Sequence, residues 1–284
     1  IVDDALPFAA SLQLAVGQAS DKGHKSQNED AIGIRIPSGV ALMTKGIVSV
    51  ISDGVSTAEG GAQASAISVS NFLADYYSTP ESWSVQTSSA KVLSALNRWL
   101  YGLGQDYRDA RRGFVCTFSA LVFKSCTVHM LHVGDSRIYR FRRGELTQLT
   151  HDHSTKINAS HQYLTRALGM DVKLDVDYKA LTLEQDDLYL LTTDGIHDQF
   201  TEYELLQKIT HFYQQHSQLN DDLCEQFCQL LIKKALALGS KDNLSAQLLC
   251  VTQLPKQAID DVYHSLSQRP FPPPMSVAMK LDGY

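Results

Sequence analysis

The sequence predicts an α+β fold in which two packed β-sheets are covered by helices. Runs typical of strands occupy the first part and much of the centre of the chain, while other parts carry apolar residues at helical spacing. The resulting order is strands, helices, many strands, helices and one final strand. With 284 residues, 44% of them hydrophobic, the chain can form a normal core.

The first hundred residues are expected to form three strands and two helices. We expect strands at residues 12–19 and 31–36, and a buried strand rich in Val and Ile at residues 46–52. Apolar residues then recur at helical spacing from Gly60 to Tyr77. A second helical pattern consists of Val92, Leu96, Trp99 and Leu103. The two helices are expected to pack side by side on a sheet.

The second half is richer in strands. Short strand-like runs between residues 114 and 150 predict a β-meander, and a strand pair is expected at residues 174–181 and 187–193. A long amphipathic helix is predicted at about residues 221–238. A strand at residues 244–252 ends the series.

The chain is expected to divide near residue 254. Residues 10–254 form the predicted domain, and residues 255–284 form a Pro-rich linker with its prolines at 270–274. An unstructured tail is the alternative interpretation of the last segment. Because the chain opens at Ile1, it is interpreted as a possible fragment.

Composition limits the classes of function. The net charge of −6 argues against nucleic-acid binding through general phosphate attraction. The odd number of cysteines and the absence of a C-x-x-C motif predict reduced thiols in a cytoplasmic protein. No apolar run approaches the ~18 residues that a membrane span needs. We therefore expect no membrane contact by this segment.

Four aspartates stand next to strand-like runs, and they carry the functional prediction. They are Asp53, Asp135, Asp194 and Asp242. Carboxylates at the ends of buried strands can converge on one rim of a sheet, where they suit hard divalent cations. Metal ions held by aspartates commonly hydrolyse phosphate esters. The alternative is that each Asp-Gly or Asp-Asn pair marks an ordinary turn.

Six short motifs, in this order, resemble those of the metal-dependent type 2C protein serine/threonine phosphatases of the bacterial type. They are NEDA (28–31), SDG (52–54), GDSR (134–137), LTRALG (164–169), TTDG (192–195) and KDN (241–243). The resemblance runs from about residue 12 to 252. It implies a four-layer α-β-β-α sandwich of two antiparallel sheets flanked by helices, with Mn²⁺ or Mg²⁺ as cofactor.

The resemblance also implies which residues hold the metal ions. Asp53 would bridge two ions, the carbonyl of Gly54 would be a further ligand, and Asp194 and Asp242 would supply the other carboxylates. A water activated by both metals would attack the phosphorus atom. Asp53 and Lys25 are therefore the expected catalytic residues.

Other residues are expected to support this centre. Asp135 resembles the ligand of a third, weaker metal, although pairing with Arg137 is the alternative. Glu29 and Asp30 resemble groups that accept hydrogen bonds from metal-bound waters, and Asn243 is expected to orient its neighbours.

The chain departs from the family pattern at three places. Lys25 stands where many members have an arginine that clamps the substrate phosphate, and a plain surface lysine is the alternative reading. Val55 stands where eukaryotic members have a histidine. Residues 155–163 are too few for the usual flap, so a missing flap and a more open cleft are expected.

The predicted function is metal-dependent removal of phosphate from phosphoserine and phosphothreonine in proteins. A catalytically weak domain that only binds phosphoproteins is the alternative, and a nuclease is disfavoured by the negative charge. The expected partners are phosphorylated proteins. The final residues, MKLDGY, resemble the start of a kinase domain fused C-terminally, which would be one candidate substrate.

Overall fold

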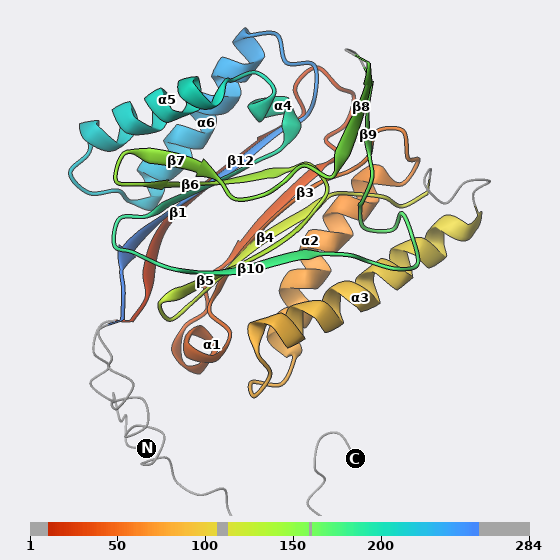
Figure 1. Cartoon of the computed structure of the whole chain (residues 1–284), viewed down its shortest axis with the longest axis horizontal. Coiled ribbons are helices and arrows are strands. Elements are labelled where there is room, and N and C mark those ends of the chain that lie inside the picture. The colour runs from red at the N-terminus through yellow and green to blue at the C-terminus, as the bar shows by residue number, and fades with distance from the viewer. Residues whose placement is uncertain (1–10, 107–112, 159–160, 256–284) are drawn as a thin grey trace, which may run out of the picture.

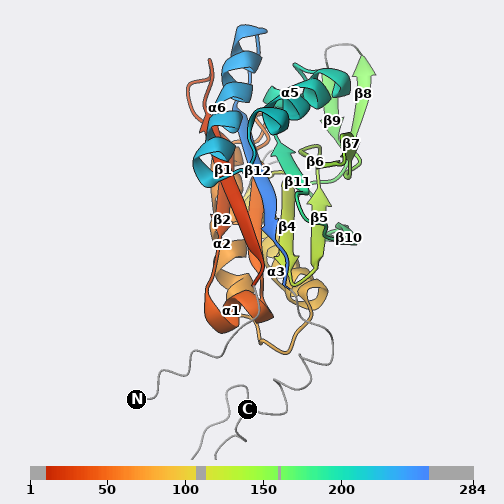
Figure 2. The same ribbon diagram turned by 90° about the vertical axis from the view of Figure 1, so that its left-hand side faces the viewer.

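Two antiparallel sheets packed face to face form the centre of the molecule (Figures 1 and 2). The computed structural model describes residues 11–106, 113–158 and 161–255. Within these ranges each of the two sheets has five strands. The first sheet contains, in spatial order, β1 (Gln13–Asp21), β12 (Leu244–Gln253), β11 (Leu188–Thr192), β6 (Arg137–Arg142) and β7 (Glu145–Gln148). The second sheet contains β10 (Asp177–Thr182), β5 (Thr127–Val133), β4 (Phe118–Lys124), β3 (Ile47–Asp53) and β2 (Asp30–Arg35).

Helices cover the outer face of each sheet. The helices are α1 (Gly39–Thr44), α2 (Gly61–Ser78), α3 (Val85–Leu103), α4 (Asp194–His197), α5 (Glu202–Gln215) and α6 (Asp221–Ala237), with a 3₁₀ turn η1 (Gly104–Asp106). Helices α5 and α6 pack on the first sheet, and α2 and α3 pack on the second (Figure 1). The predicted four-layer α-β-β-α sandwich is confirmed.

Strand β3 shows how the sequence builds these layers. Val48 and Val50 face the helices, whereas Ile47 and Ile51 face the first sheet, because successive side chains of a strand point to opposite faces. All four are buried. Full burial of such a side chain stabilises the fold by about 1.5–3 kcal/mol, so a strand buried on both faces is mainly apolar. The buried Ser49 and Ser52 of the same strand form hydrogen bonds with Gln247 and with the carbonyl of Thr117.

Polar side chains begin the longer helices. Ser84 and Asn220 accept hydrogen bonds from backbone N–H groups in the first turns of α3 and α6. Thr201 and Glu204 form a complete capping box at the start of α5. Each such cap contributes about 1 kcal/mol and fixes where the helix starts.

The predicted strands are largely present, but two predicted pairings are wrong. The expected pair near residues 174–193 separates, because β10 pairs with β5 in the second sheet and β11 pairs with β6 and β12 in the first. The expected meander also divides between the sheets, since β4 and β5 pair in one and β6 and β7 in the other. Helices α1, α4 and α5 have no counterpart among the predicted elements.

A hairpin stands where the sequence predicts a missing flap. Strand β8 (Ser154–Asn158) pairs with β9 (His161–Leu164) in a two-stranded antiparallel sheet. Figures 1 and 2 show this hairpin at the end of the sandwich opposite α1. This segment is therefore a short hairpin, and the more open cleft stays a prediction.

Most of the predicted linker, residues 256–284, lies outside the described residues, so the domain boundary near residue 254 stays a prediction. In the described part of the chain, no helix combines the length and the apolar character needed to cross a membrane. All five cysteines, which lie in described ranges, are free thiols, and four of them are buried.

Candidate metal centre

The predicted aspartates lie at one end of the sandwich, opposite α1. Asp53 is the last residue of β3 and pairs with Asp30, the first residue of β2. Asp194 follows β11 and Asp242 precedes β12, and these strands are antiparallel neighbours in the first sheet. Asp135 lies in the connection from β5 to β6, where the chain crosses from one sheet to the other.

Burial and mutual repulsion govern the ionisation of this group. Burial, followed by the charges of Asp30 and Asp194, raises the pKa of Asp53 well above its ordinary value. Burial, followed by the charges of Asp242 and Asp135, raises the pKa of Asp194 in the same way. Burial raises the pKa of Asp30 to about 6, although hydrogen bonds from Ser245 and Thr193 oppose the rise. The carboxylates therefore lie close enough to destabilise one another's charged forms.

Two buried oxygens in this group lack a hydrogen-bond partner. Among the described residues, Asp30 Oδ1 and Asp194 Oδ1 are both buried and unsatisfied. An unsatisfied buried acceptor costs about 1–3 kcal/mol. A cation would offset both this cost and the repulsion between carboxylates, so the donor set fits a hard divalent ion.

The carboxylates do not form a closed cage as they stand. Over the described ranges, no three His, Cys, Asp or Glu side chains are arranged to hold a metal ion. The ammonium group of Lys25 instead forms an ion pair with Asp242 Oδ1 and lies 3.6 Å from Glu29 Oε2. Lys25 also donates a hydrogen bond to Ser56 Oγ (2.7 Å). A metal ligated by Asp242 would therefore compete with Lys25 for this carboxylate.

Asn243 fixes the loop that carries Lys25. Its Oδ1 accepts a hydrogen bond from the N–H of Glu29 (2.9 Å), and its Nδ2 donates to the carbonyls of Lys22 (2.9 Å) and Gln27 (3.0 Å). The side chain is buried. Its geometry agrees with the expected orienting role, because it ties the β1–β2 loop to the start of β12.

Gly54 is required by close backbone packing. A Cβ atom at this position would lie 2.3 Å from the carbonyl oxygen of Gly61, well inside contact distance. The N–H of Gly54 donates to the carbonyl of Glu29 (2.9 Å). The peptide after Asp53 is thereby held against the Glu29 segment.

Two threonines outside the set of predicted site residues support the carboxylates. Thr117 Oγ1 accepts a hydrogen bond from the N–H of Asp53 (2.9 Å). Thr193 Oγ1 donates to Asp30 Oδ2 (2.9 Å). Thr193 belongs to the TTDG motif and could have been noticed there, whereas Thr117 carries no signal in the sequence.

Arg137, the alternative partner predicted for Asp135, binds Asp152. Its Nη2 lies 2.7 Å from Asp152 Oδ2, and its Nε donates to both oxygens of the same carboxylate. Such a fork-shaped contact is geometrically specific.

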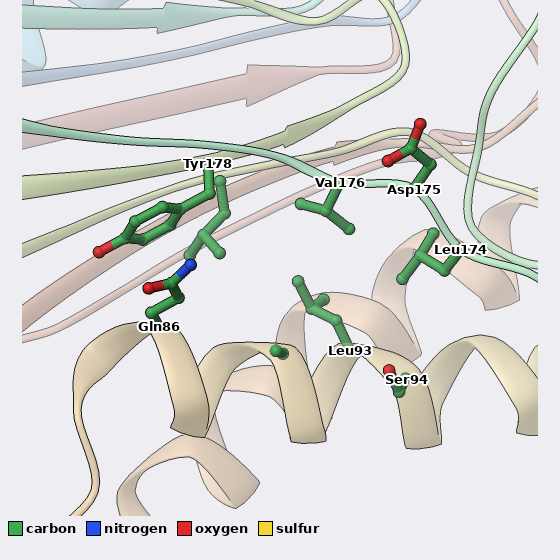
Figure 3. Close-up of a pocket in the computed structure, with 9 residues that line it drawn as sticks. Gln86, Leu93, Ser94, Leu174, Asp175, Val176 and Tyr178 are labelled. Carbon is green, nitrogen blue, oxygen red and sulfur yellow. The ribbon is translucent and has the colours of Figure 1, made fainter.

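A separate cavity lies between α3 and the segment that leads into β10 (Figure 3). Its volume is about 270 Å³, and Leu93, Leu174 and Val176 are among the apolar residues around it. None of the aspartates of the acidic group lines it. The cavity is therefore distinct from the candidate metal centre.

Comparison with known proteins gives one family and one fold. The family model described as protein phosphatase 2C matches residues 18–234. Protein phosphatase PhpP of Streptococcus pneumoniae is 25% identical over an alignment of 179 residues that covers 58% of this chain and 68% of the relative.

Solved structures give the same result for the fold. The serine/threonine phosphatase PstP of Mycobacterium tuberculosis has a TM-score of 0.67 at 21% identity, covering 84% of this chain and 99% of the other. A structure of the PstP catalytic domain in complex with two manganese ions also has a TM-score of 0.67 at 21% identity, covering 86% and 100%.

Proposed function

Because this chain belongs to the protein phosphatase 2C family and is a metal-dependent protein serine/threonine phosphatase, we propose that Asp53, Asp194 and Asp242 hold its metal ions. The family depends on Mn²⁺ or Mg²⁺. The carbonyl of Gly54 would complete the ligands. The observation that carries the proposal is the pair of unsatisfied buried carboxylate oxygens in a group of mutually repelling aspartates.

The residues around these three aspartates are proposed to hold a weaker metal ion or to support the centre. Asp135 holds a third ion more weakly, since it lies on the sheet-crossing turn beside the others and its charge acts on both Asp53 and Asp194. Glu29 and Asp30 accept hydrogen bonds from water around the ions. Asn243 keeps Glu29 in place through its backbone contacts.

When bound, two metal ions activate a water molecule for attack on phosphorus and neutralise charge on the phosphoryl oxygens. Lys25 contributes positive charge that attracts the substrate phosphate. As a point charge it lacks the two-pronged contact that arginine offers. Since its ammonium group contacts Asp242, the phosphate and this carboxylate compete for it.

The substrates are proposed to be phosphoserine and phosphothreonine in proteins of the cytoplasm. The free thiols support that location, because reduced cysteines are typical of it. A kinase domain following residue 284 remains a candidate partner, on the resemblance of the final residues to the start of such a domain.

Hydrolysis of a phosphothreonine peptide tests the proposed site. The wild-type protein should require Mn²⁺ or Mg²⁺, and Asp53→Asn should lose at least about a thousandfold in kcat/KM, equivalent to about 4 kcal/mol of transition-state stabilisation. Asp75→Asn, an exposed aspartate of α2, is the matched control and should retain wild-type activity. Full activity of Asp53→Asn would refute the assignment.

A further inference from the structure

His153 binds both backbone groups of the residue that precedes Asp135. The N–H of Gly134 donates to His153 Nδ1 (3.2 Å), and the N–H of His153 donates to the carbonyl of Gly134 (2.7 Å). These two contacts fix the peptide groups on either side of Gly134. The second of these peptides joins Gly134 to Asp135 and is held by the backbone N–H of His153, while the imidazole holds the first, so the two contacts together orient the backbone at Asp135.

The far side of the imidazole ring is fixed as well. Because Nδ1 accepts a hydrogen bond, the proton of the neutral ring lies on Nε2, which donates to Asp177 Oδ2 (3.1 Å). Burial lowers the pKa of His153, which favours this neutral form. Arg166 in turn lies 3.0 Å from Asp177 Oδ1 and 3.2 Å from Asp175. The ring is therefore held between a backbone turn and an anchored carboxylate.

The opposite side of the Gly134 turn abuts the residue that supports Asp53. Gly134 has φ +114°, and a Cβ atom there would lie 2.5 Å from Thr117 Cβ. Thr117 is the residue whose hydroxyl accepts from the N–H of Asp53. The turn thus lies between His153 and Thr117, with little freedom to move toward either.

His153 also lies at the base of the β8–β9 hairpin. Strand β8 begins at the next residue, Ser154, and the carbonyl of His153 accepts from the N–H of Thr165, which follows β9 (2.8 Å). The hairpin base and the Asp135 turn therefore belong to one hydrogen-bonded unit.

We propose that His153 is a positioning residue for Asp135. It orients the Gly134–Asp135 turn through Nδ1 and is itself oriented by Asp177. It acts without touching substrate or metal, since its side chain is buried beneath the turn. This inference rests on the proposed role of Asp135 as the ligand of the weaker metal site.

Two substitutions separate the two contacts of the ring. In His153→Asn the amide oxygen takes the place of Nδ1, so the acceptor for Gly134 is kept and the contact to Asp177 is lost. In His153→Gln the longer amide reaches toward Asp177, and the acceptor for Gly134 is lost. His151→Gln, an exposed histidine in the same segment, is the control.

The readout is the Mn²⁺ affinity of each site, measured by calorimetric titration of the whole chain and independent of turnover. We expect His153→Gln to weaken the weakest site about tenfold, and Asp135→Asn to weaken it at least as much, while the tighter sites are unchanged. His153→Asn should stay within about threefold of wild type, as should the control. A merely structural role would lower the melting temperature of both variants without separating their metal affinities.

The outcomes distinguish this inference from the proposed function. If Asp135→Asn weakens the third site and His153→Gln leaves it unchanged, or if both His153 variants act alike, the positioning role is refuted and the metal site stands. If Asp135→Asn changes no Mn²⁺ affinity, the proposed role of Asp135 as a metal ligand and the positioning role of His153 are both refuted. Should His153→Gln fail to fold, His153→Ala, which also loses the acceptor for the N–H of Gly134, takes its place with an expected loss of about tenfold at the weakest site, and no loss would overturn the proposal.

Discussion

Replacing Lys25 with methionine should strengthen metal binding and weaken substrate binding at the same time. In the described structure the Lys25 ammonium pairs with Asp242, which is a proposed metal ligand. A metal ion must therefore displace the lysine from this carboxylate. Removing the charge while keeping much of the aliphatic side chain isolates this competition.

The exposure of the two side chains sets the magnitude. Lys25 is 26% exposed and Asp242 is 41% exposed, so the pair resembles a surface ion pair more than a buried one. Such a pair contributes up to about 1 kcal/mol, which corresponds to about a fivefold change in affinity. The Mn²⁺ dissociation constant of Lys25→Met should fall about fivefold, and KM for a phosphopeptide should rise.

Calorimetric titration with Mn²⁺ and steady-state kinetics measure the two effects. Lys241→Met is the matched control, since Lys241 adjoins Asp242 in sequence and is exposed. Lys25→Arg should restore the wild-type Mn²⁺ affinity and lower KM, because arginine adds a second hydrogen bond to phosphate. An unchanged or weaker Mn²⁺ affinity in Lys25→Met, or an equal gain in Lys241→Met, would refute the competition.

Three further predictions follow from the same contacts. Relative to Asp53→Asn, the metal-free protein should lose stability as pH rises from about 4 through about 6, because the folded-state pKa of Asp30 is about 6 and those of Asp53 and Asp194 are also raised, so the acidic group binds more protons in the fold than in the unfolded chain. The buried His132, whose pKa burial lowers to about 4, has the opposite effect in both proteins, so the comparison isolates the carboxylates. The difference, on the order of 1–3 kcal/mol in urea denaturation with chelator present, should appear as a smaller fall or a larger rise of stability with pH in Asp53→Asn, and the same pH dependence in both proteins would contradict this. Gly54→Ala should destabilise the fold by about 3 kcal/mol or more in thermal unfolding, since its Cβ would overlap the Gly61 carbonyl, and a wild-type melting temperature would show that this packing is relaxed in solution. Asn243→Ala should lower the free energy of unfolding by about 1–3 kcal/mol and raise KM, because three backbone groups of the loop that carries Lys25 lose their partner. An unchanged KM would show that Asn243 does not position this loop for substrate binding.

Strand and helix positions were predictable where the residues themselves determine them. Residues 46–52 were expected to form a buried strand, and β3 occupies residues Ile47–Asp53 with only its last residue partly exposed. Partners were not predictable in the same way. Strand β10 lies at an edge and is largely exposed, while β11 is central and fully buried, so adjacency in sequence gave the wrong pairing.

Helical faces were predicted only in part. Trp99 was expected on the packed face of α3, but it is 46% exposed. The buried face instead includes Ser88, Ser89 and Asn97. Small or hydrogen-bonding polar residues of this kind can be buried, and a pattern based on apolar residues does not detect them. Asn97, for example, accepts from the N–H of Gly169 (2.8 Å) and anchors the LTRALG segment to α3.

The aspartates of the centre were found from motifs and strand ends, but their surroundings were not. The contact of Lys25 with Asp242 joins residues far apart in the chain, and so do the contacts of Thr117 with Asp53 and of His153 with Gly134. Such contacts depend on how the two sheets are packed and on which loops meet at their common end. A single sequence gives residue types and local spacing, which do not specify which distant segments come into contact.

Titration of the metal-free protein with Mn²⁺ tests the central claim most directly. Wild-type protein and Asp75→Asn should bind two ions tightly, whereas Asp53→Asn and Asp194→Asn should bind at least about a hundredfold more weakly, beyond the range seen for residues that only support a ligand. Tight binding that survives in both Asp53→Asn and Asp194→Asn would show that the buried carboxylates are not the metal site.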